Sequence, residues 1–496
     1  MATKISQELL VMILNNVKSI HDLYSSLLVN RTWCKITIPI LWELAFDQEF
    51  NWMNYNKCRR RALCVRTYIS CMDNQSRTLL TQSGFDLSSS PPQVTFNYPS
   101  FTREFRIDNL AHFISIYSQK IIGSYQDNYD NNNNKHIIIA KSRILFLEIC
   151  KLIINRCTFL DSFKMTKVPK IFFENFLNSD LICSIFTLPG AAKVFKKFRT
   201  FVLETINDEP ISLLYESLAL ICNNILNMDL EFRSDSQMEV LGKLICVQKR
   251  LENLSIIGVS YLNFNLLLWN IISQKEILKS LRLKSVSFYN FKGKLPIGQF
   301  TSLQELYIEN CHELYSSECL SLASSFTQLS SFHFFYQCNK LPQKFIIKIL
   351  ETANTNLKNI YLDCLTIPSD TFSAILIYCT KITELTLLDL SLEQVIAIFN
   401  NNFNELKRFS FHCGIGLDAN ELLRKMVESV PESLEIIEIR MGIFNADSLR
   451  KFFKGWCSKE GGRNKKMIVN RQEQLFTLSN EHFKVIEEYG VQFNIK

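Results

Sequence analysis

Cysteine and histidine side chains stand next to each other at two places, and these pairs are the first candidates for metal or redox chemistry. Cys311 is followed by His312, and His412 is followed by Cys413. Neighbouring residues in a strand point to opposite faces, so neither pair predicts a ready metal site. The chain has no Cys-x-x-Cys, His-Glu-x-x-His or Gly-x-Ser-x-Gly sequence and no phosphate-binding glycine loop. We therefore expect no catalytic residue, no metal and no cofactor.

A second group that could do chemistry combines three cysteines with a basic run. Cys58, Cys64 and Cys71 lie close to the triplet 59–61, which is Arg-Arg-Arg. The triplet could contact a phosphate or an acidic partner. A solvated helix face is the commoner explanation for such a run, and it is the one that we prefer.

A short apolar motif recurs eleven times and predicts the elements that would position a binding surface. Its pattern is apolar, two free residues, apolar, one free residue, apolar, and the clearest copy has Leu303, Leu306 and Ile308. The other copies begin at Leu160, Phe198, Ile225, Leu251, Leu278, Leu329, Leu357, Ile382, Leu406 and Leu434. From Phe198 onward the copies are 24 to 28 residues apart. This period indicates a stacked solenoid, in which each copy adds one strand to a continuous sheet.

Stretches with helical spacing lie between the strand motifs. Examples are residues 236–245, 342–353, 369–379 and 418–430. Ser391 with Gln394, and Asp418 with Glu421, fit the capping box of a helix start. Residues 285–302 lack a helical pattern and are expected to form a loop instead. Each unit is therefore predicted to run strand, turn, helix, return, and the segment after residue 478 adds a closing helix and strand.

The amino-terminal residues 5–46 have helical spacing as well. Leu9, Leu10, Ile13 and Leu14 recur at helical intervals, and a second apolar run follows them. A unit of about 40 residues is too small to bury all its large apolar groups, and an exposed apolar patch normally marks a partner site. The alternative is a helical cap that shields the end of the solenoid core.

This amino-terminal segment resembles an F-box, a module that docks onto a Skp-type adaptor and through it onto a cullin–RING ubiquitin ligase. The resemblance rests on Glu8-Leu9-Leu10, on Leu28-Val29-Asn30-Arg31 with Trp33 and Cys34, and on Pro39-Ile40-Leu41-Trp42. It carries the adaptor contacts over to Ile5, Leu9, Leu10, Ile13, Leu14, Leu27, Val29 and Trp33. Ser6 stands where the family commonly has Pro, and the loss of a rigid helix entry is expected to weaken adaptor binding.

The repeats resemble leucine-rich repeats, although only Cys311 occupies the position where that family usually has Asn or Cys. The whole arrangement is similar to the F-box/leucine-rich-repeat families of some fungi. The expected fold is an α/β leucine-rich-repeat solenoid, or horseshoe, preceded by a small all-α F-box module. We expect the F-box at 1–46, a helical and loop connecting region with polar inserts at 47–155, and the repeat array with its carboxy-terminal cap at 156–496.

The resemblance implies a non-catalytic, substrate-recognition subunit of a Skp–cullin–F-box ubiquitin ligase, whose repeats bind a target protein for ubiquitination. The alternative is a repeat-based protein-binding or inhibitor scaffold without a role in a ligase. Within each strand, the residues on either side of the last two motif positions would line the concave face. The predicted target contacts are Arg282, Glu305, Tyr307, His333, Phe335, Tyr361, Asp363, Arg408 and His412. Tyr307, Phe335 and Tyr361 are expected on nearby strands, with His333 and His412 farther out.

The composition sets limits on the class of partner. The concave positions mix both signs of charge with aromatic residues, which favours a protein over a nucleic acid. The net charge of +7 over 496 residues does not require a nucleic-acid or membrane partner. There is no signal-peptide pattern and no run of 18 apolar residues. The sixteen cysteines are then expected to be reduced thiols, in the cytoplasm or the nucleus or both.

Overall fold

The structure is a computed structural model in which two compact units can be distinguished. It describes residues 6–17, 19–43, 63–88, 94–121, 132–166, 176–204, 212–232, 235–263, 265–289, 300–337, 341–364, 366–401, 403–413, 418–440, 444–458, 465–470 and 479–495. Unit 1 is Met1–Leu251 and unit 2 is Glu252–Lys496.

Unit 1 begins with a module of three helices, α1 (Gln7–Asn15), α2 (Ile20–Leu27) and α3 (Arg31–Glu43). Ser6, which stands where Pro was expected from the resemblance, serves as the N-cap of α1. Its hydroxyl accepts a hydrogen bond from the backbone N–H of Leu9 at 3.2 Å. Such a cap satisfies one of the free amides of the first turn, so the first turn of α1 is stabilised without Pro.

Several helices and a first strand follow the three-helix module. They are α5 (Leu63–Ser70), α6 (Asn74–Gln82), the 3-10 helix η1 (Tyr98–Phe101), β1 (Glu104–Arg106), α7 (Ile107–Ile121) and α8 (Asn132–Arg156). Strand β1 lies inside the segment that was predicted to be a connecting region of helices and loops. Thr102, Phe105 and Ile107 occupy the three motif positions and are fully buried. The polar Thr102 at the first position hides this copy from a search for apolar residues.

The remainder of unit 1 continues the same ladder of parallel strands. The strands are β2 (Ser162–Met165), β3 (Thr200–Leu203) and β4 (Asn227–Phe232), and β1 to β4 pair in chain order. The helices are α10 (Ser179–Thr187), α11 (Ala191–Phe195), α12 (Ser212–Ile221), α13 (Met238–Cys246) and the 3-10 helix η2 (Asp235–Gln237).

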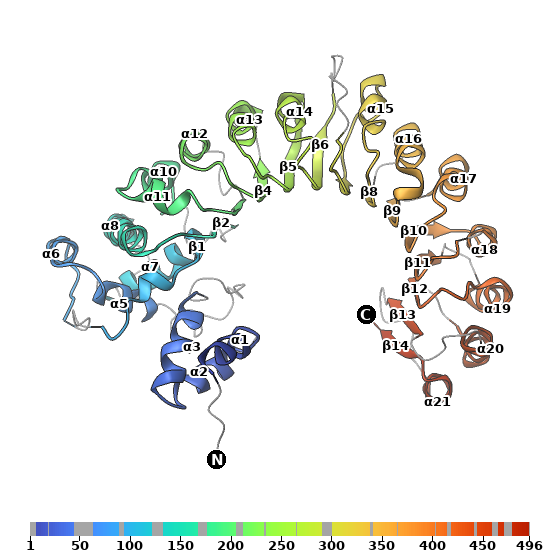
Figure 1. Ribbon diagram of the computed structural model, residues 1–496, viewed down its shortest axis with the longest axis horizontal. Helices are drawn as coiled ribbons and strands as arrows, with labels where there is room; N and C mark the ends of the chain where they lie inside the picture. The colour runs from blue at the N-terminus through green and yellow to red at the C-terminus, as the bar shows by residue number, and fades with distance from the viewer. Residues whose placement is uncertain are drawn as a thin grey trace. The chain divides into compact units, whose positions relative to one another are not determined.

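Unit 2 is a regular succession of parallel strands and helices. Its strands are β5 (Asn253–Asn263), β6 (Ser280–Ser287), β7 (Glu305–Glu309), β8 (Ser331–Tyr336), β9 (Asn359–Cys364), β10 (Glu384–Leu390), β11 (Arg408–Cys413), β12 (Ile436–Arg440), β13 (Lys466–Asn470) and β14 (Gln492–Ile495). Its helices are α14 (Asn265–Ile272), α15 (Ser317–Ala323), α16 (Gln343–Ala353), η3 (Asn354–Asn356), α17 (Ser369–Tyr378), α18 (Leu392–Asn400), α19 (Ala419–Ser429), α20 (Ala446–Cys457) and α21 (Asn480–Tyr489). Figure 1 shows the strands on one side of this unit and the helices on the other.

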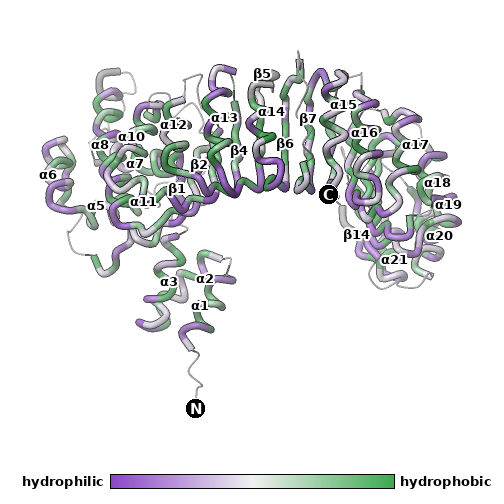
Figure 2. The backbone as a smooth tube through the Cα atoms, turned by 45° about the horizontal axis from the view of Figure 1, so that its top comes forward, coloured by the Kyte–Doolittle hydropathy of each residue, from purple (hydrophilic) through white to green (hydrophobic). Residues whose placement is uncertain are grey.

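The eleven predicted motif copies all form strands, and each strand begins two residues after its motif does. In the copy that forms β7, the motif residues Leu303, Leu306 and Ile308 are all buried. Hydrophobic positions are interspersed with hydrophilic ones along both units, as Figure 2 shows. The α/β solenoid-like architecture is thus confirmed. We call the face of the sheet that is turned away from the helices the open face.

The helix predictions are confirmed with one correction. The four predicted stretches form α13, α16, α17 and α19, and the closing helix and strand are α21 and β14. Ser391 and Gln394 form the reciprocal capping box at α18. The box predicted for Asp418 and Glu421 is wrong, because Asp418 accepts instead from the N–H of Asn420 at 2.9 Å. Most of the loop expected at 285–302 lies outside the described residues.

Candidate protein-interaction surfaces

The helical module α1–α3 divides its apolar side chains between a small core and an exposed surface. Leu10, Leu14 and Leu23 are buried against one another. Trp33 packs against this cluster and is half-buried. Helical spacing places the residues next to Leu10 and Leu14 on the outside, so the module exposes apolar groups that it has no interior to hold.

The residues predicted to contact an adaptor are therefore not equivalent. Leu9, Ile13 and Val29 have 49, 44 and 56% of their surface exposed. Leu10 and Leu14 belong to the core of the module, and Leu27 and Trp33 are half-buried. Ile5 lies outside the described residues. The module also exposes Val11, Met12, Tyr24 and Leu28, which were not among the predicted contacts. Their helical spacing relative to the core residues was the signal that could have identified them.

Helix α3 is tied to the helices that follow it through aromatic contacts within unit 1. The ring of Trp42 lies 4.4 Å from that of Tyr98 and 5.6 Å from that of Tyr68, measured between centroids. The hydroxyl of Tyr68 is 3.0 Å from the hydroxyl of Thr102 at the start of β1. Burial raises the pKa of Tyr68 well above its usual range. A buried chain of contacts thus links the end of α3 to the first strand.

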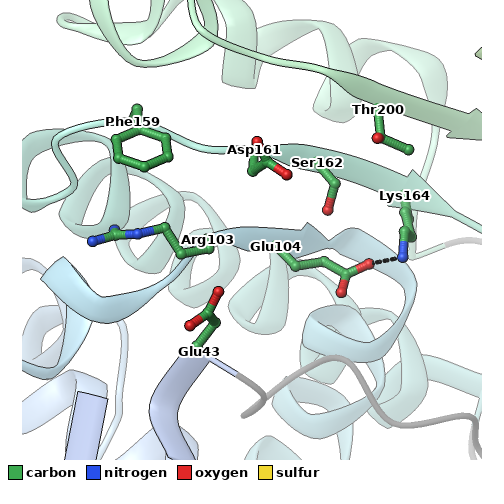
Figure 3. Close-up of a pocket in the computed structure, with 8 residues that line it drawn as sticks. All are labelled: Glu43, Arg103, Glu104, Phe159, Asp161, Ser162, Lys164 and Thr200. Atoms are coloured by element: carbon green, nitrogen blue, oxygen red, sulfur yellow. Dashed lines mark ion pairs between the residues drawn. The ribbon is translucent and has the colours of Figure 1, made fainter. Parts of the chain in front are cut away.

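A hollow of about 380 Å³ lies on unit 1 where α3 ends and β1 to β3 begin. Figure 3 shows its lining residues, which are Glu43, Arg103, Glu104, Phe159, Asp161, Ser162, Lys164 and Thr200. Glu104 and Lys164 form an ion pair, and the guanidinium of Arg103 lies 4.7 Å from the centroid of the Phe159 ring. The mixed charges suit a polar partner group. This hollow was not predictable from the apolar motif, because it depends on strand β1.

The open face of unit 2 carries three rows of side chains, because equivalent residues of neighbouring strands lie opposite each other. The first row starts each strand and includes Glu305, Ser331, Asn359, Glu384 and Arg408. The middle row runs Arg282, Tyr307, His333, Tyr361, Thr386, Ser410 and Glu438. The third row includes Lys284, Glu309, Phe335 and Asp363, and ends at His412 and Arg440. All nine predicted target contacts therefore lie on this one face.

Three rings of the middle row form a stack across adjacent strands. The ring of His333 lies 4.1 Å from that of Tyr307 at an interplanar angle of 19°, and 5.7 Å from that of Tyr361 at 21°. The expectation that His333 lies farther out was wrong, because the register brings it between the two tyrosines. Phe335 belongs to the third row and not to this stack. We call Tyr307, His333 and Tyr361 the aromatic ladder.

Ion pairs occupy both sides of the aromatic ladder. On one side, Glu309 pairs with Arg282 at 3.3 Å and also with Lys284. On the other, the nearly buried Glu438 accepts from Arg408 at 2.8 Å and lies 3.5 Å from Nε of Arg440. These cations are thus held by acidic neighbours on the face itself.

Burial also changes the protonation of two groups on this face. The pKa of His333 is lowered by its burial and, to a smaller extent, by the charge of Arg282. Burial raises the pKa of Asp363, while the hydroxyl of Tyr361, which donates to Asp363 at 3.1 Å, acts in the opposite direction. His333 is therefore neutral near pH 7, and its ring nitrogen lies 3.0 Å from the Ser331 hydroxyl.

The other groups considered for chemistry lie apart from one another. Within the described ranges, no three His, Cys, Asp or Glu side chains are placed to hold a metal ion. Cys311 is buried, and burial raises its pKa to about 12, so it is a thiol at neutral pH. Cys58 and the triplet 59–61 lie outside the described residues. None of the helices in the described part combines the length and apolar character of a membrane span.

Comparison of the sequence with models of known protein families gives no match, and a search of curated proteins finds no relative. What the helical module and the open face can bind is therefore inferred from their geometry and from the resemblance of their residues.

Proposed function

We propose that this protein is a substrate-recognition subunit of a Skp–cullin–F-box ubiquitin ligase. In this proposal helices α1–α3 bind a Skp-type adaptor, and the open face of the sheet binds the target protein. The supporting observation is the division within α1–α3, where Leu10 and Leu14 hold the module together while Leu9 and Ile13 are exposed. Large apolar side chains on the outside of so small a unit favour a protein partner.

The proposed role needs no catalytic group in this chain. Its task is to hold a target near a conjugating enzyme that other subunits supply. Holding two reactants together replaces an encounter in solution with an intramolecular one and raises the effective concentration of the target. A strand ladder that presents polar and aromatic side chains in rows suits this task, because a protein interface draws its energy from a few aromatic and charged anchors.

Co-purification of the full chain with a Skp-type adaptor tests the proposal. The wild-type chain is expected to bind at one-to-one stoichiometry. The Leu9→Glu/Ile13→Glu double variant is expected to lose binding by at least a hundred-fold, because it places two carboxylates in an apolar interface. Both side chains are exposed, so the module should keep its fold, as circular dichroism can verify. A variant at Leu10 would be less informative, since it removes part of the core.

Leu220→Glu is a matched control for this experiment. Leu220 lies on α12 and is 87% exposed, so the same change is made on another helix of unit 1. This variant should bind the adaptor like wild type. Unchanged binding by the Leu9→Glu/Ile13→Glu variant, or no binding by the wild-type chain, would remove the ligase role. The protein would then be better described as a repeat-based binding scaffold.

A further inference from the structure

The open face of unit 2 has a region that is both acidic and aromatic. The open-face positions of β7, β8, β9 and β10 include four acids and no lysine or arginine. We call the part formed by Glu305, Tyr307, His333, Tyr361, Asp363 and Glu384 the acidic–aromatic surface. From it we infer that the target segment bound by this face is basic and extended, with lysine or arginine side chains placed against the aromatic ladder. This inference rests on the proposed role of the open face in binding a target.

The acidic residues of this surface differ in whether their carboxylates already have a hydrogen-bond or ion-pair partner. Asp363 accepts from the hydroxyl of Tyr361, and Glu309 next to the surface pairs with Arg282 and Lys284. Glu305 and Glu384 are exposed, and neither forms an ion pair within the described part of the chain. These two carboxylates beside the aromatic ladder, which form no ion pair even though Arg408 aligns with Glu384, complement a cationic ligand. They repel the phosphates of a nucleic acid.

The aromatic ladder adds a second attraction for the same kind of side chain. Tyr307 and Tyr361 are half-buried, and their rings are held by stacking on His333. A guanidinium or ammonium group near an aromatic ring is attracted to the ring, and the methylene stem of the same side chain packs on apolar surface. Rings that are already held in place lose little freedom when a ligand binds. Basic side chains are therefore favoured over neutral ones.

The register sets the spacing of the basic residues. Glu305 aligns with Ser331, Asn359 and Glu384, so the two free carboxylates are three strands apart. Three strand spacings amount to roughly 14 Å. An extended chain covers about this distance in four residues. A target segment that crosses the strands would thus place one basic residue on Glu305 and another, four positions along the segment, on Glu384. A third basic residue, midway between these two, would lie over the aromatic ladder.

The next strands limit the length of the bound segment. Arg408 and Arg440 stand beyond Glu384 and would repel a longer run of positive charge. Between these groups Ser410 is 1% exposed, and its hydroxyl has no hydrogen-bond partner among the described residues. Ser410 alternates with the buried Phe409 and Phe411, so its side chain belongs to the open face.

The test uses the full-length protein and a labelled nine-residue peptide with three arginines at alternate positions in a glycine–serine background. Fluorescence anisotropy at 50 mM salt is expected to show saturable binding, weakened at least five-fold at 300 mM salt because the contact is electrostatic. The Glu305→Lys/Glu384→Lys variant is expected to bind this peptide at least ten-fold more weakly. It should prefer a peptide with glutamate in place of arginine, and the wild-type protein is expected not to bind that peptide.

Glu276→Lys/Glu428→Lys is the control with the same net charge. Both of these residues are exposed, and neither belongs to the open-face rows. The control should bind the arginine peptide like wild type. Equal binding by both charge variants would overturn the inference, as would a lack of saturable binding by the wild type. Preference of the wild-type surface for a single-stranded oligonucleotide over the peptide would overturn it as well.

The adaptor variant separates this inference from the proposed function. Leu9→Glu/Ile13→Glu changes only the helical module, so it should bind the arginine peptide with wild-type affinity. A protein that binds the peptide but no adaptor would retain the inferred surface and lose the ligase role. A protein that binds the adaptor but not the peptide would retain the ligase role and lose the inferred surface.

Discussion

Glu438 and Ser410 show that the direction of a side chain and its exposure are separate properties. Both residues alternate with core residues along their strands and therefore belong to the open face. Glu438 is nevertheless only 4% exposed, because Arg408 and Arg440 close over it from the first and third rows. Alternation along a strand predicts direction, whereas exposure depends on the size and charge of neighbours on other strands. Substitutions at Glu438 would leave two arginines without their shared partner.

His112 is the residue from which we expect a pH-dependent stability. It lies in α7, where burial lowers its pKa from the ordinary 6.5 to about 4. Between these values the unfolded chain binds a proton and the folded chain does not, so folding loses stability as the pH falls below 6.5. The loss amounts to roughly 2 kcal/mol at pH 5 and is complete below pH 4. Urea unfolding of the wild type and of His112→Gln at pH 7 and pH 5 measures this change in the free energy of unfolding.

The variant should lose less stability than the wild type over this interval, since Gln does not titrate. His21→Gln serves as the control, because His21 lies at an exposed position of α2 and its replacement should leave the wild-type pH dependence in place. The explanation fails if His112→Gln and the wild type lose stability equally between pH 7 and pH 5.

At the scale of elements, the packing of α20 on α19 requires a glycine. A Cβ at Gly455 in α20 would overlap the Cγ1 methyl of Val427 in α19. Valine is rigid about χ1 and cannot turn the methyl aside easily. We expect Gly455→Ala to lower the free energy of unfolding by about 1–3 kcal/mol, despite the gain of about 1 kcal/mol in helix propensity.

Val427→Ala removes the overlapping methyl and is expected to restore most of the stability lost in Gly455→Ala. Urea midpoints of the two single variants and of the double variant give the coupling between the two positions. An additive result, with no recovery in the double variant, would show that the two helices do not meet through these residues.

The strands were predictable where all three motif positions are apolar, and they were missed where a motif position is polar. The three buried residues of each recognised motif follow from solvent exclusion alone, so the eleven strands could be placed from the sequence. Strand β1 has Thr102 at the first motif position, and no copy of the motif was recognised at β13. In a single sequence, a polar residue at a motif position cannot be distinguished from a break in the repeat.

The open-face side chains were predictable as a set but not as an arrangement. The strand period alone selected Tyr307, His333 and Tyr361 for the same face. Their stacking depends on the parallel register, which brings equal motif positions opposite each other. The ion pairs of Glu309 and Glu438 depend in addition on the rotamers of long side chains. In the helical module, likewise, spacing identified apolar residues but did not separate the buried Leu10 from the exposed Leu9.

At the scale of the whole molecule, helix α21 and strand β14 cover one side of strand β13. Strand β14 pairs with β13, and His482 of α21 lies with Nε2 3.0 Å from the carbonyl of Phe444. Removal of residues 479–496 would leave β13 with unpaired backbone groups above the buried Met467 and Val469. We expect the shortened protein to self-associate, because the deletion uncovers these apolar side chains and moves the open edge of the sheet from the four-residue β14 to the longer β13.

Size-exclusion chromatography with light scattering over a range of concentrations measures this effect. The full-length protein provides the reference for the shortened one, and thermal unfolding should show a lower midpoint after the deletion. A shortened protein that stays monomeric at every concentration at which the full chain does would show that β13 protects its own edge.

The alternation along each strand has a consequence for how such a protein can change over generations. Leu306 and Ile308 hold β7 in the sheet, while Glu305 and Tyr307, which alternate with them, face outward. The residues that keep the fold and the residues that contact a partner are therefore different ones. A substitution at an outward position away from the buried clusters typically alters stability by less than about 0.5 kcal/mol. Mutations can therefore accumulate on one face without endangering the fold. Such a chain can exchange one recognised molecule for another in small steps, each of which yields a folded protein.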